Sequence, residues 1–178
     1  MNDKRGLLYD LGGTLVPEIN PAKGIGPMMN LNSARLGKLG YHLNADKFVL
    51  YQYVLGKQQG IVTTVPQMFM PWFYESPAIN ARAPIRENFD CVVAREFGKA
   101  TKPSPIPYVE ALERLRLEAD ECIAFENSLT GALAVKGVEK LTGKKLSLCI
   151  INEPLARRDR EKLHEMADFD IDNFAELM

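Results

Sequence analysis

Asp10 is the residue of this sequence that is best placed to do chemistry. It follows the apolar run 6–9 and precedes a short loop that contains Gly12, Gly13 and Thr14. Glycines let backbone N–H groups approach a bound anion closely, and a carboxylate at a strand end can ligate a hard cation or attack phosphorus. The pattern indicates a phosphate or metal site, with an ordinary Asp-Leu-Gly-Gly turn as the alternative.

Two later stretches add polar groups that suit the same chemistry. Lys102 stands before the proline-rich segment 103–105, and Glu126 and Asn127 follow the apolar run 122–125. A lysine cation can neutralise phosphoryl oxygens, and carboxylate or amide oxygens can ligate Mg²⁺. The alternative for Lys102 is a surface lysine before a helix.

Together these stretches resemble three motifs of the haloacid dehalogenase-like (HAD-like) hydrolases, in the order in which that family carries them. Residues 7–15 resemble motif one, usually written DxDGT. Lys102 matches the motif-three lysine in its KPxP form, and residues 122–131 resemble the strand and loop of motif four. The spacing of the three motifs supports the resemblance more strongly than any single motif does.

That spacing resembles the β-phosphoglucomutase and phosphoglycolate phosphatase branch, where a helix and then a strand separate Lys102 from Glu126. Residues 89–93 resemble the strand that precedes the lysine in this branch. The resemblance covers residues 5–16 and 89–176 well and the part between them poorly. It implies a Rossmann-like three-layer α/β fold, with a central parallel sheet and a small helical cap insertion.

The resemblance also implies a mechanism and a cofactor. Asp10 is expected to be the nucleophile that forms an aspartyl-phosphate, and Lys102 to hold the nucleophile and the phosphoryl oxygens by its charge. Mg²⁺ is the implied cofactor, with Asp10, Glu126 and Asn127 as its ligands. These roles suit the residue types, because phosphoryl transfer depends mainly on positioning and charge neutralisation.

The substrate implied by the resemblance is a small phosphorylated metabolite, whose phosphoryl group needs donors at the strand ends. Motif two provides one as a Ser or Thr, for which Thr63 is the candidate and Thr64 the alternative. A plain β-branched strand end is the other interpretation of this stretch. The residues expected to bind the substrate are Gly12, Gly13, Thr14, Thr63 and Lys102.

Two positions depart from the family pattern. The second aspartate of DxDGT, which acts as general acid and base, is Gly12 here, and one member of the acidic pair of motif four is Asn127. General acid–base catalysis contributes about 10² to 10⁴ in rate, and an amide gives the Mg²⁺ site one charge fewer. We therefore expect a phosphatase that is slow unless its leaving group is a good one.

The same departures keep two other functions open. One is a catalytically impaired HAD-like protein that binds a phosphorylated ligand or a protein partner. The other is a hydrolase of the dehalogenase or phosphonatase kind, which resembles this chain in lacking the second acid. A phosphonatase needs a Schiff-base lysine, for which Lys38, Lys47 and Lys57 are candidates, although they are surface lysines by default.

The elements that must position these residues alternate in type. Apolar runs bounded by turn residues predict strands at 6–9, 61–64, 91–93, 122–125, 146–151 and 169–171. Helical spacing predicts helices at 108–117, 129–135 and 155–166, the second closed by Gly137 or Gly143. Such alternation gives a parallel sheet with ligands at the carboxyl ends of its strands. Asp10, Lys102 and Glu126 should therefore meet at one edge of the sheet.

The middle of the chain has a different character. Residues 17–59 contain two helical patterns, 28–39 and 45–59, which we interpret as a small helical cap inserted into an α/β core of residues 1–16 and 60–178.

Residues 66–86 combine prolines with large apolar side chains such as Phe69 and Trp72, and no regular element is predicted there. The density of apolar residues favours a core or an interface over a substrate-facing lid.

The composition limits the number of domains, the kinds of partner and the chemistry of the cysteines. With 178 residues, of which 46% are hydrophobic and 25% charged, the chain fits one domain with a modest appendage. Its net charge of -1 supplies no attraction to nucleic acid or to an anionic membrane. No apolar run could span a bilayer and no signal-peptide core follows the start, so we expect a cytoplasmic protein. Cys91, Cys122 and Cys149 lack CxxC spacing and are expected to be buried free thiols.

Overall fold

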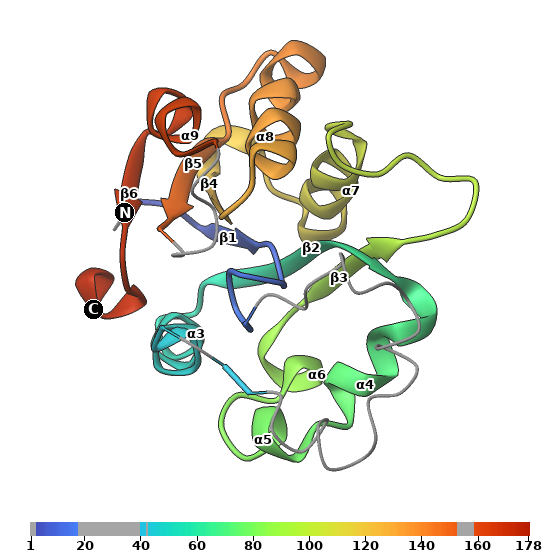
Figure 1. The fold of residues 1–178 in the computed structure, drawn as a ribbon, viewed down its shortest axis with the longest axis vertical. Coiled ribbons are helices and arrows are strands. Elements are labelled where there is room, and N and C mark those ends of the chain that lie inside the picture. Colours follow the sequence, from blue (N-terminus) through green and yellow to red (C-terminus); the bar gives the residue numbers. More distant parts are fainter. Residues whose placement is uncertain (1–2, 18–39, 42, 153–158) are drawn as a thin grey trace.

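The computed structural model describes residues 3–17, 40–41, 43–152 and 159–178, which form a six-stranded parallel sheet (Figure 1). The strand order is β3-β2-β1-β4-β5-β6. The strands are β1 (Gly6–Tyr9), β2 (Gln58–Pro66), β3 (Cys91–Arg95), β4 (Cys122–Glu126), β5 (Ser147–Ile151) and β6 (Phe169–Ile171). β1 lies between β2 and β4, so the loops that follow these three strands are neighbours.

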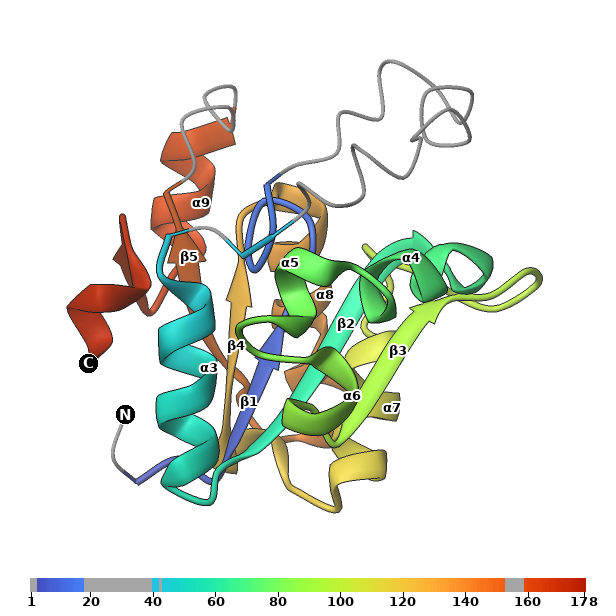
Figure 2. The ribbon, with the colours of Figure 1, turned by 90° about the horizontal axis from the view of Figure 1, so that it is seen from below.

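Helices cover both faces of the sheet, as Figures 1 and 2 show. One face carries α7 (Ile106–Leu115), α8 (Leu129–Thr142) and α9 (Arg160–Met166). The other carries α3 (Ala45–Val54), α4 (Met70–Tyr74), α5 (Pro77–Asn80) and α6 (Ile85–Asn88). Three short 3₁₀ turns are described as well, η2 (Gln67–Phe69), η3 (Ala119–Glu121) and η5 (Phe174–Leu177). The predicted α/β fold with a central parallel sheet is confirmed. None of the described helices is long and apolar enough to cross a membrane.

Alternation along β1 gives a hydrophobic core on each face of the sheet. Tyr9 packs in the core on the side of α3, and Leu8 packs in the core on the side of α7. In the first core, the ring centroids of Tyr9 and Phe125 lie 5.0 Å apart, and those of Phe48 and Phe174 lie 5.1 Å apart. Phe174 therefore ties η5, near the end of the chain, to the centre of the sheet.

β2 is longer than the run 61–64 that was predicted for it, because a buried polar residue takes part in the strand. The side chain of Gln59 accepts a hydrogen bond from the Tyr9 hydroxyl at 2.8 Å and donates to the carbonyl oxygens of Val49 and Asn88. These bonds satisfy the amide inside the core. A pattern based on apolar residues misses such a position.

α3 differs from the interpretation of residues 45–59 as part of a cap. Its Phe48 is fully buried in the core beside the sheet, and the chain has already entered β2 at Gln58. The helical spacing was correct for residues 45–54 but not for the rest of the predicted range, and spacing alone does not say what a helix packs against. Residues 18–39, with the first predicted cap helix, lie outside the described residues, so the cap itself stays a prediction.

α8 ends at Gly143, the later of the two glycines predicted to close it. Gly143 has a φ of 72°, a left-handed conformation in which glycine commonly ends helices. Gly137 lies inside the helix instead. The predicted helix 155–166 is described from residue 160 onward, as α9, because residues 153–158 lie outside the described residues.

The segment 66–86 contributes to the core, as its apolar residues indicated. Met70, Phe73, Ile79 and Ile85, from the three short helices, are all buried. Prolines stand in the first turns of α4 and α5, where a missing backbone N–H costs no helical hydrogen bond.

All three cysteines are free and buried, as predicted. Burial raises the pKa of Cys91 to about 11 and that of Cys122 to about 12. At neutral pH these thiols are protonated, which suits a structural role rather than a reactive one.

Phe174→Ala should lower the free energy of unfolding by about 3 to 5 kcal/mol, because it leaves a cavity among buried rings. Phe97→Ala removes a ring that is fully exposed and should leave stability nearly unchanged. Urea denaturation followed by circular dichroism measures both variants. If both variants lost the same amount of stability, the packing of Phe174 in the core would be contradicted.

Candidate active site

Asp10 lies directly after β1, at the carboxyl end of that central strand. Its backbone N–H donates to the carbonyl oxygen of Phe125 at 2.9 Å, which fixes it beside the end of β4. The chain then turns back, and the N–H groups of Leu15 and Val16 both donate to the carbonyl oxygen of Leu11 at 3.0 Å. The side chains of these last three residues are buried, so the loop after Asp10 is anchored in the core.

Lys102 reaches Asp10 from the loop between β3 and α7. Its Nζ donates to Asp10 Oδ1 at 2.7 Å and to Glu126 Oε1 at 2.5 Å. The exposed fractions of Asp10, Lys102 and Glu126 are 7%, 5% and 0%, so the three charges are buried together. The predicted convergence of these residues at one edge of the sheet is confirmed.

Glu126 receives hydrogen bonds on both of its carboxylate oxygens. The Tyr108 hydroxyl donates to Oε1 at 2.6 Å, beside Lys102, and the Ser128 hydroxyl donates to Oε2 at 3.3 Å. Gly131, in the first turn of α8, leaves room for this carboxylate. A Cβ atom at Gly131 would lie 1.9 Å from Cδ of Glu126, so the acid occupies the space that a side chain there would need.

One ammonium group shared between two carboxylates leaves a negative charge in excess in the buried site. Burial raises the pKa of Asp10 to about 7; Lys102 opposes this shift and the charge of Glu126 adds to it. Burial lowers the pKa of Lys102, but the two carboxylates outweigh it and hold that pKa above its ordinary value. A bound cation would neutralise the excess charge.

The two glycines after Asp10 differ in backbone conformation and in the space beside them. Gly13 has a φ of 79°, and its N–H donates to the carbonyl oxygen of Val16 at 2.7 Å. This N–H is therefore used in a hydrogen bond within the loop. Gly12 does not have a positive φ, and a Cβ atom there would meet nothing within 4 Å. Thr14 is buried. The roles of these residues in binding a substrate stay predictions.

The other predicted contributors lie at the ends of β2 and β4. Thr63 is buried, and its Oγ1 accepts a hydrogen bond from the N–H of Val65 at 3.1 Å, whereas Thr64 is exposed. Exposure of Thr64 favours Thr63 as the motif-two residue. Asn127 directly follows β4 and is buried. Their roles at a phosphoryl group and a metal ion also stay predictions.

The lysines considered for a Schiff base lie elsewhere. Lys47 is exposed on α3, and the Lys57 ammonium donates to the carbonyl oxygen of Lys4, at the amino end of β1. That end of the sheet is opposite to Asp10. Lys38 lies outside the described residues.

Tyr108 and Gly131 belong to the site, although the sequence predicted neither role. Tyr108 was expected on the apolar face of a helix, and its buried ring does lie in the core, 5.2 Å from Lys102 Nζ. The sequence did hold one signal for this role: a tyrosine on the apolar face of a helix needs a hydrogen-bond partner for its buried hydroxyl. For Gly131 the signal was a glycine in the first turn of a helix, where it lowers helix stability and often marks a close approach.

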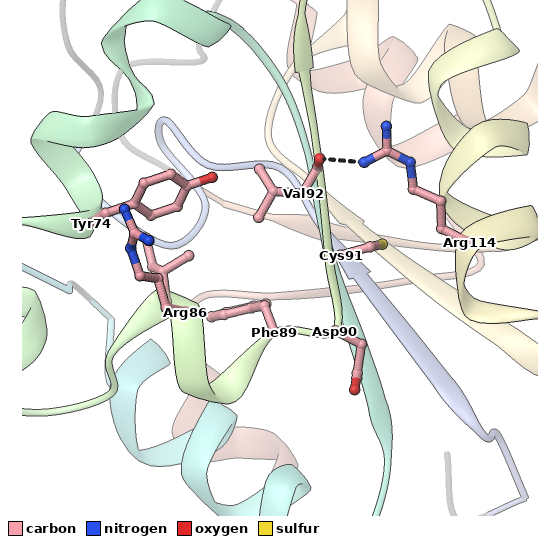
Figure 3. Close-up of a pocket in the computed structure, with 8 residues that line it drawn as sticks. Tyr74, Arg86, Phe89, Asp90, Cys91, Val92 and Arg114 are labelled. Atoms are coloured by element: carbon pink, nitrogen blue, oxygen red, sulfur yellow. Dashed lines mark hydrogen bonds between the residues drawn. The ribbon is translucent and has the colours of Figure 1, made fainter.

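A separate pocket of about 620 Å³ lies along the edge strand β3 (Figure 3). The two arginines that line it come from opposite sides of the strand, and both are already engaged. Arg114 donates to the carbonyl oxygen of Val92 at 2.9 Å, and Arg86 stacks on the ring of Tyr74. Because this pocket has no buried ion cluster like that at Asp10, we place the candidate active site at Asp10.

Gly131→Ala should lower the free energy of unfolding by about 2 to 4 kcal/mol, because the new methyl group displaces the Glu126 carboxylate from its donors. Gly137→Ala is the matched control on the same helix, where the nearest atoms to a new Cβ lie 3.1 Å away, on Pro105. This contact is tight but far less severe than that at Gly131, and the gain in helix propensity of about 1 kcal/mol opposes it, so the control should cost much less stability than Gly131→Ala. Guanidinium denaturation measures both, and a Gly131→Ala variant as stable as the control would contradict the proposed packing.

Comparisons with known proteins bear on the fold of the chain. No family model matches the chain. A curated relative, the protein CbbY of Cereibacter sphaeroides, is 36% identical over 94 residues, which make up 53% of this chain and 37% of that protein. The match therefore spans well under half of the relative's length.

Solved structures share the fold over nearly the whole chain. The structure of CbbY from Rhodobacter sphaeroides in complex with phosphate has a TM-score of 0.74 at 19% identity, with 98% of this chain and 96% of that chain covered. A mutant of the same protein in complex with xylulose-(1,5)bisphosphate has a TM-score of 0.72 at 19% identity and the same coverage. A HAD hydrolase of family IA from Entamoeba histolytica has a TM-score of 0.71 at 16% identity, with 98% and 95% covered. The chain therefore has the fold of the HAD-superfamily hydrolases.

Proposed function

We propose that the protein is a phosphohydrolase of the HAD type that acts on a small phosphorylated metabolite through an aspartyl-phosphate. One observation carries the proposal: Lys102 Nζ bonds both Asp10 and Glu126 in a buried site at the carboxyl edge of the sheet. Of the two carboxylates, Asp10 keeps some exposure and Glu126 has none, so Asp10 is the one that a substrate would reach. The phosphate and the sugar bisphosphate in the CbbY structures support a phosphorylated substrate.

In the proposed reaction, an oxygen of the Asp10 carboxylate attacks phosphorus, and the bond from phosphorus to the leaving oxygen breaks. Lys102 holds the carboxylate in place and neutralises charge on the phosphoryl oxygens. Water then attacks the phosphorus of the aspartyl-phosphate, which releases phosphate and restores Asp10.

The leaving group receives no proton from position 12, where the family pattern has an aspartate and this chain has Gly12. The leaving oxygen must depart as an anion or take its proton from water. Esters with acidic leaving groups should therefore react faster than esters of sugar alcohols.

The site fits a Mg²⁺ ion, because it has a negative charge in excess and oxygen donors. Asp10, Glu126 and Asn127 would hold the ion, because Oε2 of Glu126 accepts one hydrogen bond, from Ser128, and keeps a second lone pair. Within the described part of the chain, no three His, Cys, Asp or Glu side chains gather as a metal cluster. Mg²⁺ usually keeps several of its waters and takes only one or two carboxylates from the protein. When bound, Mg²⁺ would stabilise charge on the phosphoryl oxygens.

The second candidate function is a catalytically impaired protein that binds a phosphorylated ligand. Gly12 and Asn127 favour it, because each replaces a carboxylate of the family pattern with an uncharged group.

Asp10→Asn should abolish the proposed activity, with a fall in turnover of at least about 10³, because it removes the nucleophile. The test measures phosphate release from p-nitrophenyl phosphate and sugar phosphates with Mg²⁺ and with a chelator, beside 2-haloacids and phosphonoacetaldehyde. The wild type should act on the phosphate esters only with Mg²⁺. A wild type that binds phosphate esters without turning them over would support the impaired binder, and unchanged turnover in Asp10→Asn would mean another mechanism.

The stability of Asp10→Asn is the control for this experiment, because the variant also removes a buried charge. The folded protein raises the pKa of Asp10 to about 7, so it binds a proton that the unfolded chain releases near pH 4. The wild type should therefore lose stability as pH rises from about 4 to about 7, at no more than about 1.4 kcal/mol per pH unit from this group. Denaturation without metal should show that Asp10→Asn lacks this loss.

Gly12→Asp should raise turnover, because it returns a carboxylate to the place where the family protonates the leaving group. The open space beside Gly12 and its ordinary φ allow the substitution. The gain in kcat/KM should reach up to about 10² to 10⁴ on sugar phosphates, whose alkoxides need a proton, and should be small on p-nitrophenyl phosphate, whose anion leaves unaided.

Gly12→Asn is the matched control, because it has the same shape without an acid. An equal gain on both substrates, or an equal gain from Gly12→Asn, would point to folding or binding rather than to proton transfer.

A further inference from the structure

The outer side of α3 is apolar, although its inner side already packs on the sheet. Phe48 faces the core, whereas Leu50, Tyr51 and Val54 are 39%, 44% and 81% exposed. Figure 2 shows α3 along its length, with none of the described helices or strands in front of it. A helix that is apolar on both sides is usually covered on both, and an exposed apolar patch of this kind marks an interaction surface.

Of the five exposed residues of α3, four lie along one line of the helix, and Tyr53, which is 55% exposed, lies beside that line. Lys47, Leu50, Tyr51 and Val54 follow the helical spacing i, i+3, i+4 and i+7, and we call them the outer stripe of α3. Lys47, in the first turn, is the charged member of the stripe. The last turn carries no basic residue, so its carbonyl groups give it the partial negative charge of a helix C-terminus.

We propose that the outer stripe binds α3 of a second copy of the chain, packed antiparallel about a two-fold axis. The spacing of the stripe is symmetric about its midpoint. In an antiparallel pair, Lys47 meets Val54 of the second copy and Leu50 meets Tyr51 of the second copy. Each lysine then lies over the negative end of the opposite helix, and apolar side chains meet apolar side chains.

The outer stripe is self-complementary, which favours a second copy of the chain over a different protein. The same surface carries both the cation, Lys47, and the partially negative helix end that would accept it. The net charge of -1 offers little repulsion between two copies. α3 has 10 residues, which is a length of about 15 Å, so the contact is small. We therefore expect a dimer that dissociates readily, with a Kd of about 10 to 100 μM.

Sedimentation equilibrium of the whole chain, from about 1 to about 500 μM, should show a monomer–dimer equilibrium. Val54→Lys should weaken association at least about tenfold, because each new lysine then meets Lys47 of the second copy and the two ammonium groups repel each other. The helix itself should tolerate the change, because a lysine in the last turn interacts favourably with the helix dipole. Phe97→Lys is the matched control, since it changes a fully exposed apolar residue outside α3. It should leave the Kd within about twofold.

A charge reversal tests the antiparallel register. Lys47→Glu alone should weaken association, because it places a carboxylate over the negative helix end. Lys47→Glu combined with Val54→Lys places opposite charges face to face twice in each dimer, and should restore the Kd to within about threefold of the wild type. A wild type that stays monomeric to about 500 μM overturns the proposal. So does a double variant, folded by circular dichroism, that associates no more tightly than Val54→Lys.

Discussion

The candidate site depends on one buried ammonium group that is shared by two carboxylates. Lys102, Asp10 and Glu126 come from three segments that are distant in the sequence, and none of them would be stable in the interior without the others. Removing water from three charges is costly, and it is tolerated where further hydrogen bonds complete the cluster. Tyr108 and Ser128 supply those bonds on Glu126.

The fold meets this requirement through the order of its strands. β1 pairs with β4 in register, so Asp10 and Glu126 leave neighbouring strands at the same edge. Directly beneath them, the stacked rings of Tyr9 and Phe125 occupy the positions that precede the two acids. The charged site and the aromatic core are thus consecutive layers of the same two strands, and a loss of packing below would move the charges above.

The sequence predicted the features that follow from local pattern and from the geometry of parallel sheets. Asp10, Lys102 and Glu126 could be placed together because strands alternating with helices put all carboxyl ends at one edge. The features that it missed depend on partners distant along the chain. Gln59 is a strand residue because Tyr9 and two backbone carbonyls satisfy its amide, and α3 belongs to the sheet because of what Phe48 contacts. No local pattern encodes such a contact.

The Glu126 carboxylate occupies the volume that a side chain at Gly131 would need, and this links the side-chain sizes that the two positions can accept. A larger residue at position 131 is compatible with the fold only if the acid at position 126 is shorter, as aspartate is, and withdraws its carboxylate. The ammonium group of Lys102 would then have to reach further to keep both of its partners. The side chains at positions 102, 126 and 131 therefore constrain one another, because a change of size at one of them alters the space or the reach that another needs.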